Sequence, residues 1–285
     1  MLAGSFSQVC DDWEHFLQRK YKPVNPVESF RTYDIAKPSV VKLYKEQHQK
    51  QTLDFVIRSR QKFSQLDKAH MGIWEALEML NELKDESDND TELSQIEHCL
   101  QTAEALKRNA KKERFDDWMI LTGLIHDLGK LLYYFGAEGQ WDVVGDTFPV
   151  GCRFSEKIVY PEFFKSNPDY YNPAYNSLYG IYKANCGLDN VLMSFGHDEY
   201  MYMVAEKYLP QEALYIIRYH SFYGQHRENA YTHLMNERDH EMMKLVKTFN
   251  SYDLYSKSDA PPDITKLKPY YQTLIRKYFP DKINW

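Results

Sequence analysis

Apolar residues recur along much of the chain at every third or fourth position, the spacing that places them on one face of an α-helix. Residues 73–80 and residues 96–106 follow this spacing most clearly, and each predicts an amphipathic helix. Residues 39–65 contain neither Gly nor Pro and are rich in good helix formers, so we expect one long helix there. Comparable patterns predict further helices at about 116–132, 198–208, 211–219, 237–257 and 269–279.

The helical pattern breaks between residues 135 and 185, where Gly and Pro recur. Within this stretch, residues 141–151 could form one short pair of strands. Irregular segments of such length inside a compact domain usually serve a function. The first 38 residues also lack a period and contain three prolines, which predicts an extended arm packed on the body. We therefore expect a mainly α, single compact domain with a few short strands in its loops.

Composition narrows the classes of function. The 285 residues are enough to bury a sizeable core. Lys and Arg total 35 against 41 Asp and Glu, so we expect no nucleic-acid or membrane partner. No apolar run is long enough for a transmembrane helix, and the N-terminus lacks the pattern of a secretory signal. The cysteines lie far apart without a CxxC pair, which favours free thiols in a reducing, cytoplasmic location: Cys10, Cys99, Cys152 and Cys186.

The candidate chemistry lies in the ten histidines and two aspartates. Four histidines fall on apolar helix faces or at the ends of predicted elements, namely His98, His126, His197 and His220. Two aspartates share such positions, Asp127 and Asp253. The remaining histidines have polar neighbours, which indicates the surface for His15, His48, His70, His226, His233 and His240.

His126 and Asp127 follow the apolar run of residues 119–125, where an unpaired carboxylate would be costly. Because neighbouring helical residues point about 100° apart, the pair can offer both groups to one cation, or its carboxylate can bridge two cations. The dipeptide alone is weak evidence, since chance gives about one such pair and His197-Asp198 is a second. The alternative is a helix end with a satisfied histidine.

Asp253 lies seven residues after Val246 and four after Phe249, on the stripe of its helix that should be buried. A carboxylate there needs a partner, which could also be a lysine or a helix N-terminus. Lys130 follows His126 by four residues and lies on the same helical side. Beside cations its pKa would fall, so that it could exchange a proton with a bound hydroxyl. The alternative is a lysine that favours a helix C-terminus.

Together, four imidazoles and two carboxylates on separate helices suit a site for two metal ions. Nitrogen and oxygen ligands without a thiolate fit iron, manganese, zinc or cobalt. Six ligands, one of them bridging, would leave vacant the coordination positions that catalysis needs. Taken alone, His98 is more often a core histidine than a ligand.

The motif HDLGK at residues 126–130 is the signature of the HD-domain superfamily of metal-dependent phosphohydrolases and their relatives. A longer set of motifs resembles the myo-inositol oxygenase family from about Ser29 to the C-terminus. These motifs are DESD (85–88), EHCLQTAE (97–104), LIHDLGK (124–130), WDVVGDTFPVGC (141–152), CGLDNVLMSFGHDEY (186–200), IIRYHSFY (216–223) and FNSYDLYSK (249–257). The resemblance implies one HD-like helical domain over residues 29–285, preceded by an N-terminal arm over residues 1–28.

The resemblance also implies an activity and its cofactors. The family opens the ring of myo-inositol with O2 to give D-glucuronate and water. It uses two non-haem iron ions per chain, mixed-valent Fe(II)/Fe(III) when active. One iron would be held by His98, His126, Asp127 and Asp253, and Asp127 would bridge to the second, which His197 and His220 also hold. We expect myo-inositol and O2 as the partners and a monomeric chain.

Substrate contacts are implied in the same way. They are Arg31, Asp85, Glu86, Ser87, Lys130, Gly145, Asp146, His220 and Ser221. Lys130 would be catalytic, holding or moving a hydroxyl proton, and the arm and loops would form a lid. Without the motifs, residues 85–90 would be a solvated turn and Arg31 a surface cation.

Two alternatives compete with the oxygenase. An HD-type phosphohydrolase would use the same pair of metals to activate water, but it would need several cations for phosphate. One lysine and one arginine facing several acids favour a neutral polyol. A non-enzymatic scaffold would not need the intact set of six ligand types.

Overall fold

A computed structural model describes residues 38–82, 94–256 and 262–285. The expected N-terminal arm at residues 1–28 lies outside these residues, and so does the proposed lid function of that arm. Four of the implied substrate contacts also lie outside them, namely Arg31, Asp85, Glu86 and Ser87.

The described part of the chain is mainly α, which confirms the predicted fold class. Its α-helices are α2 (Pro38–Lys50), α3 (Leu53–Phe63), α4 (Ile73–Leu80), α5 (Gln95–Glu113), α6 (Asp117–Ile125), α7 (His197–Ala205), α8 (Gln211–Tyr219), α9 (Tyr223–His226), α10 (Glu237–Ser256) and α11 (Ile264–Ile275). Its 3₁₀ helices are η3 (His126–Tyr133), η4 (Gln140–Asp142), η5 (Pro161–Ser166), η6 (Pro168–Tyr171), η7 (Leu188–Asn190) and η8 (Thr232–Leu234). The described strands, β1 (His70–Met71) and β2 (Ile283–Asn284), form one antiparallel pair.

The single long helix predicted for residues 39–65 is wrong, because the chain forms α2 and α3 with a break between them. Thr52 begins α3, and its hydroxyl accepts a hydrogen bond from the Phe55 backbone N–H at 3.1 Å. The neighbouring Gln51 side chain donates to the Phe195 carbonyl at 2.7 Å and accepts from the Phe195 N–H at 2.9 Å. The Thr52 cap of α3 and the bonds from Gln51 to the Phe195 backbone therefore separate α2 from α3, although no Gly or Pro lies between them.

The helix predicted for about 116–132 also differs from the structure, since α6 ends at Ile125 and η3 continues it in a tighter form. Gly129 lies so close to α7 that a Cβ there would be 1.9 Å from the His197 carbonyl oxygen. Only a residue without a side chain permits this approach. The tighter turn thereby brings η3 against the first residue of α7, which is the arrangement that the site requires.

Two smaller expectations need correction. Residues 141–151 begin within η4 and form no strand pair, and Pro149 makes a single bridge to Met193. The last helix, α11, begins at Ile264 instead of Pro269, because Asp263 caps it by accepting from the Lys266 backbone N–H at 3.2 Å. Pro269 lies inside this helix.

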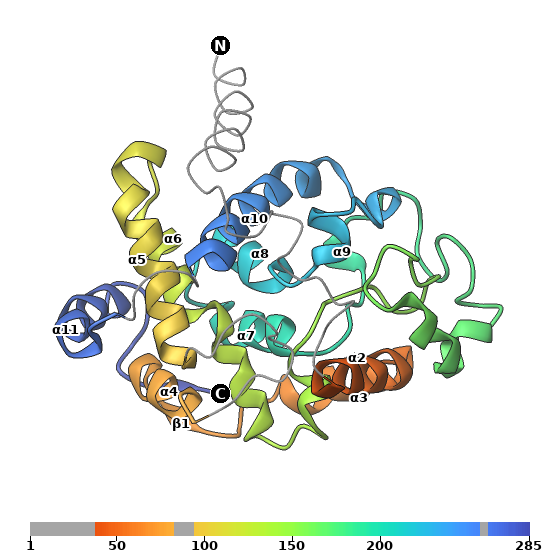
Figure 1. Ribbon diagram of the computed structural model, residues 1–285, viewed down its shortest axis with the longest axis horizontal. Helices are drawn as coiled ribbons and strands as arrows, with labels where there is room; N and C mark the ends of the chain where they lie inside the picture. The colour runs from red at the N-terminus through yellow and green to blue at the C-terminus, as the bar shows by residue number, and fades with distance from the viewer. Residues whose placement is uncertain (1–37, 83–93, 257–261) are drawn as a thin grey trace, which may run out of the picture.

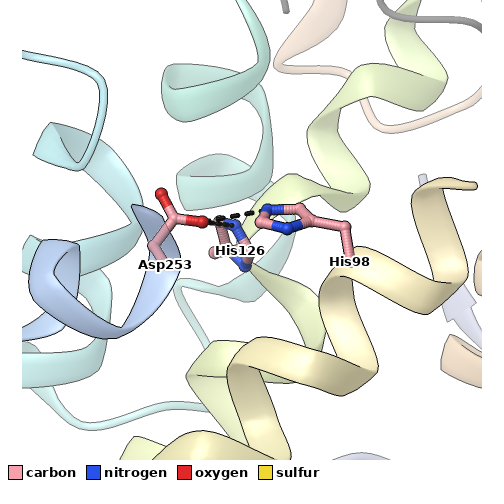
Figure 2. Close-up of side chains that lie close together, drawn as sticks. All are labelled: His98, His126 and Asp253. Carbon is pink, nitrogen blue, oxygen red and sulfur yellow. Dashed lines mark ion pairs between the residues drawn. The ribbon is translucent and has the colours of Figure 1, made fainter. Parts of the chain in front are cut away.

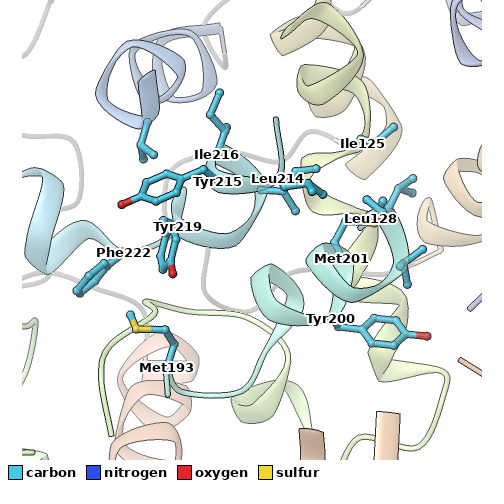
Figure 3. Packing of buried hydrophobic residues seen from close by; sticks show 14 of the residues in the cluster. Ile125, Leu128, Met193, Tyr200, Met201, Leu214, Tyr215, Ile216, Tyr219 and Phe222 are labelled. Atoms are coloured by element: carbon cyan, nitrogen blue, oxygen red, sulfur yellow. The ribbon is translucent and has the colours of Figure 1, made fainter. Parts of the chain in front are cut away.

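Helix α8 lies between α7 and α10, with α5 and α6 side by side next to them (Figure 1). Apolar side chains fill the space between these helices, as Figure 3 shows for Leu214 of α8, Met201 of α7 and Leu128 of η3. A buried ion pair also joins α7 to α8, since Arg218 Nε lies 2.8 Å from Glu199 Oε2. The packing fixes the relative positions of the segments that carry the candidate site.

The prediction of surface positions is wrong for His48 and His226, which are 0% and 6% exposed. The His48 ring stacks on Phe164 with centroids 4.0 Å apart, and burial lowers its pKa to about 3. His226 lies with Nε2 3.1 Å from the His220 carbonyl oxygen. Among the described helices, none has both the length and the apolar content needed to cross a membrane.

Candidate metal centre

The six side chains predicted as ligands come from five segments and converge in the interior. His98 lies on α5, His126 and Asp127 begin η3, His197 begins α7, His220 directly follows α8, and Asp253 lies on α10. All six are buried, and the most exposed of them is only 8% accessible. Residues separated by more than 150 positions therefore meet at one point.

Asp127 lies between two pairs of imidazoles. Its Oδ2 is 3.6 Å from His98 Nε2 and 3.5 Å from His126 Nε2. Its Oδ1 is 3.6 Å from His197 Nε2 and 3.7 Å from His220 Nε2. Each oxygen thus faces a separate pair of nitrogens, which is the arrangement that a carboxylate bridging two cations requires.

Asp253 completes the first of these groups. Its Oδ1 lies 2.9 Å from His98 Nε2 and 3.3 Å from His126 Nε2, and the three side chains point toward one another in Figure 2. Burial would raise the pKa of Asp253, but the charge of His126 and hydrogen bonds from both imidazoles hold it well below its usual value. The buried acid that looked anomalous on its helix stripe therefore has two partners.

Backbone carbonyls fix the orientation of three of the imidazoles. The Nδ1 atoms of His126, His197 and His220 lie 3.0, 2.8 and 2.9 Å from the carbonyl oxygens of residues 123, 143 and 217. Because a carbonyl only accepts, each Nδ1 carries a proton and each Nε2 of a neutral ring is left with a lone pair. Metal-binding histidines are commonly oriented in this way.

The second pair of imidazoles supplies a test of fit for a cation. His197 Nε2 and His220 Nε2 are 3.3 Å apart, and both are acceptors in their neutral forms. Two lone pairs at this distance repel each other unless a proton or a metal ion lies between them. The donor set of four imidazoles and the carboxylates fits iron, manganese, zinc or cobalt. Cys99 supplies no thiolate here, because burial raises its pKa.

Lys130 lies beside this cluster. Its Nζ is 2.8 Å from Asp127 Oδ2 and 3.2 Å from Gln95 Oε1, and the residue is 7% exposed. Burial would raise the pKa of Asp127, but the charges of Lys130 and His126 hold it well below its usual value. The carboxylate between the two pairs of imidazoles is therefore ionised, as a metal ligand must be.

Three further implied substrate contacts, Gly145, Asp146 and Ser221, lie within the described residues. Ser221 Oγ lies 3.2 Å from His197 Nε2, and the Ser221 carbonyl accepts from the Thr147 backbone N–H at 2.9 Å. The loop that holds Gly145 and Asp146 is thereby joined to the end of α8. Gly145 has a φ of +99°, a conformation that side-chain-bearing residues rarely adopt.

Sequence reasoning missed several polar residues that shape this loop. The Tyr44 hydroxyl donates to Asp146 Oδ1 at 2.8 Å, and Gln47 Nε2 donates to the carbonyls of Val144 and Asp146, both at 3.1 Å. The sequence could have indicated them, because Tyr44 and Gln47 are three residues apart on α2 and therefore lie on one face of the helix, which is buried.

Asp198 was also missed. Its Oδ1 lies 2.9 Å from His197 Nε2 and accepts from Ser221 Oγ at 3.0 Å. It belongs to the second His-Asp dipeptide, which chance alone could explain in the sequence. The structure instead places it against the second pair of imidazoles.

Comparison with known proteins agrees with this geometry. The sequence model of the family described as "Myo-inositol oxygenase" matches residues 37–285. Inositol oxygenase 1 of Arabidopsis thaliana is 54% identical over 90% of this chain and 84% of its own length. Inositol oxygenase of Dictyostelium discoideum is 50% identical over 95% of both chains, and that of Bos taurus is 47% identical over 90% of this chain and 91% of its own. This chain belongs to the myo-inositol oxygenase family.

Proposed function

We propose that this protein is a di-iron oxygenase that opens the ring of myo-inositol with O2 to give D-glucuronate and water. Family membership supports the reaction and its inositol substrate. The buried His and Asp groups support a metal cofactor. The single observation that carries the proposal of two ions is that each oxygen of Asp127 faces its own pair of imidazoles.

The proposed ligands divide into two sets. His98, His126 and Asp253 would hold the first iron, His197 and His220 the second, and Asp127 both. When bound, the iron pair supplies Lewis acidity toward a hydroxyl and the redox capacity to use O2. The side chains hold this pair in a buried site, from which bulk water is kept away.

The reaction balances without an external reductant at each turnover. Myo-inositol, C6H12O6, and O2 give D-glucuronic acid, C6H10O7, and H2O. The polyol supplies all four electrons that reduce O2, so the protein needs no electron-transfer partner in the cycle. Its residues therefore have to bind and orient a neutral polyol, move protons and exclude water.

Lys130 is the proposed catalytic residue. Its Nζ is fixed 2.8 Å from the carboxylate that lies between the two proposed ion positions. A hydroxyl of the substrate bound there would lie within reach of this amine, which would hold or pass on its proton. Gly145, Asp146, His220 and Ser221 would line the polyol site, together with Arg31, Asp85, Glu86 and Ser87 from outside the described residues.

The charge of the site disfavours the phosphohydrolase alternative. Lys130 adds one positive charge to a cluster that holds three buried carboxylates, Asp127, Asp198 and Asp253. A site for a phosphoryl substrate usually supplies several cationic side chains besides its metal ions, whereas Lys130 is the cationic side chain that contacts this cluster among the described residues. We also propose a cytoplasmic location, which the free thiols of Cys99, Cys152 and Cys186 support. The monomeric state stays a prediction.

An oxygen-electrode assay with product identification tests the proposal. Protein loaded anaerobically with iron should consume one O2 for each myo-inositol and release D-glucuronate. His220→Ala is the matched control and should take up no oxygen, because it removes a proposed ligand. Release of phosphate from a phosphorylated inositol, without oxygen uptake, would instead establish the hydrolase.

A further inference from the structure

We propose that Asp198 is a positioning residue that fixes the Ser221 hydroxyl as a hydrogen-bond acceptor for the bound polyol. This inference rests on the proposed function, in which Ser221 contacts myo-inositol. It adds the group that decides whether Ser221 donates or accepts the hydrogen bond in that contact.

Three donors from Ser221 and Thr147 surround the Asp198 carboxylate, and His197 Nε2 lies 2.9 Å from its Oδ1. Its Oδ1 accepts from the Ser221 hydroxyl at 3.0 Å, and its Oδ2 accepts from the Ser221 backbone N–H at 3.1 Å. The Thr147 hydroxyl lies 3.2 Å from the same Oδ2 and donates to it. Asp198 is only 2% exposed, so these donors take the place of solvent. Two of the three come from the one residue that the proposal concerns.

The hydroxyl proton of Ser221 has two acceptors within reach, Asp198 Oδ1 and His197 Nε2, the latter at 3.2 Å. His197 Nδ1 donates to the Val143 carbonyl, so Nε2 is the atom that would bind a metal ion. Without a metal ion, its 2.9 Å contact with Asp198 Oδ1 is that of a protonated nitrogen, so in neither state does Nε2 accept the Ser221 proton. With that nitrogen committed, the Ser221 proton goes to Asp198. A hydroxyl has only one proton, so Ser221 Oγ can then only accept from a ligand.

Asp198 also joins the three segments that surround this point. It lies at the start of α7, its bonds to Ser221 reach the end of α8, and its bond to Thr147 reaches the loop after Gly145 and Asp146. The Thr147 backbone N–H completes the link by donating to the Ser221 carbonyl at 2.9 Å. The carboxylate thus sets both the position of the Ser221 hydroxyl and its role as an acceptor toward the ligand.

The experiment is a double-mutant cycle on myo-inositol affinity. Isothermal titration calorimetry on iron-loaded protein without O2 gives the Kd for the wild type, Asp198→Asn, Ser221→Ala and the double variant. Asn keeps the shape but turns one acceptor into a donor, so Ser221 would have to accept from it. We expect each single variant to weaken binding roughly tenfold, the cost of about one hydrogen bond.

If Asp198 acts through Ser221, the double variant binds inositol no more weakly than Ser221→Ala does. Asp198 lies with His197 and His220 in a group that could itself hold a metal ion, so iron content separates the two roles. A positioning residue predicts wild-type iron content in all variants. Asp239→Asn is the matched control. This aspartate is 1% exposed and accepts from the backbone N–H groups of Leu188 and Asn236, but it precedes Asp253 by about 21 Å along α10. It should lower stability and leave the inositol Kd unchanged.

The inference would be overturned if the loss of affinity in the double variant equalled the product of the two single-variant losses. Loss of iron in Asp198→Asn would also overturn it. Should Asp198→Asn fail to fold, Thr147→Val replaces it in the cycle, because it removes one donor and keeps the carboxylate. Its weakening of about threefold should vanish in the Ser221→Ala background, and persistence there would refute the inference. Failure of the wild type to bind inositol would contradict the proposed function itself.

Discussion

Lys130 and Asp127 form the closest contact between a cation and the carboxylate at the centre of the site. Their 2.8 Å separation places the lysine beside the carboxylate oxygen that faces His98 and His126. An ammonium group cannot coordinate a metal while it is protonated. The role of Lys130 can therefore be separated experimentally from that of the six proposed ligands.

Lys130→Ala should keep its iron and lose activity with myo-inositol by a factor of about 10² to 10⁴, the range for a missing acid–base group. Iron analysis and oxygen uptake on the same sample measure both quantities. Loss of iron in parallel with activity would make Lys130 a structural residue.

His48 illustrates how a distant environment decides the protonation of one side chain. Burial lowers its pKa from 6.5 to about 3, so it stays neutral in the folded protein while the unfolded chain binds a proton below 6.5. Because the pKa is lowered in the folded protein, the contribution of His48 to the free energy of unfolding is fully present above pH 6.5. It is lost as the pH falls from 6.5 toward 3. The loss is about 1.4 kcal/mol for each pH unit.

His48→Phe should remove this one-proton contribution, because Phe can stack on Phe164 but cannot be protonated. Urea unfolding between pH 4 and pH 6 should show a slope of the unfolding free energy smaller by about 1.4 kcal/mol per pH unit than in the wild type. An unchanged slope would mean that His48 is accessible to protons in the folded state.

At the scale of elements, helices with a regular local apolar pattern could be predicted, whereas features that depend on tertiary contacts could not. The helices over residues 73–80 and 96–106 were predicted correctly, since each has a regular apolar face that packs inward. The break at Gln51 and Thr52 was missed, because the Gln51 partner is the backbone of Phe195, distant in sequence. The 3₁₀ form of η3 depends in the same way on contact with α7.

Gly129 is the element-scale feature most open to test, since its missing side chain lets η3 approach α7. Gly129→Ala would place a methyl group 1.9 Å from the His197 carbonyl oxygen, so the two segments must separate. We expect a loss of about 1–3 kcal/mol of unfolding free energy and a lower iron content.

Gly224→Ala is the control for this substitution, because the nearest heavy atom to its Cβ would be at 3.4 Å, an ordinary contact. Denaturant unfolding and iron analysis of both variants give the comparison. Equal effects at the two positions would show that the close approach of η3 to α7 has no special importance.

At the scale of the whole molecule, the site exists only when α5, η3, α7, α8 and α10 pack together. The sequence could propose six of its members, because histidines and aspartates at buried positions are chemically conspicuous and the family motifs contain them. It could not single out Asp198, whose partners Ser221 and Thr147 are joined to it only by the fold. It also misplaced His48, whose ring partner Phe164 lies more than a hundred residues away.

Because the donors are scattered along the chain, the unfolded protein has no preformed site, and binding of metal should be coupled to folding. The central claim concerns the centre of this arrangement. It holds that Asp127 bridges two metal ions, each facing one of its oxygens.

Anomalous diffraction at the iron absorption edge, from crystals of anaerobically iron-loaded protein, tests this claim most directly. We expect two iron peaks per chain, one between Asp127 Oδ2 and the group of His98, His126 and Asp253, the other between Oδ1 and the pair His197 and His220. A single peak, or two peaks that both lie away from Asp127, would contradict it.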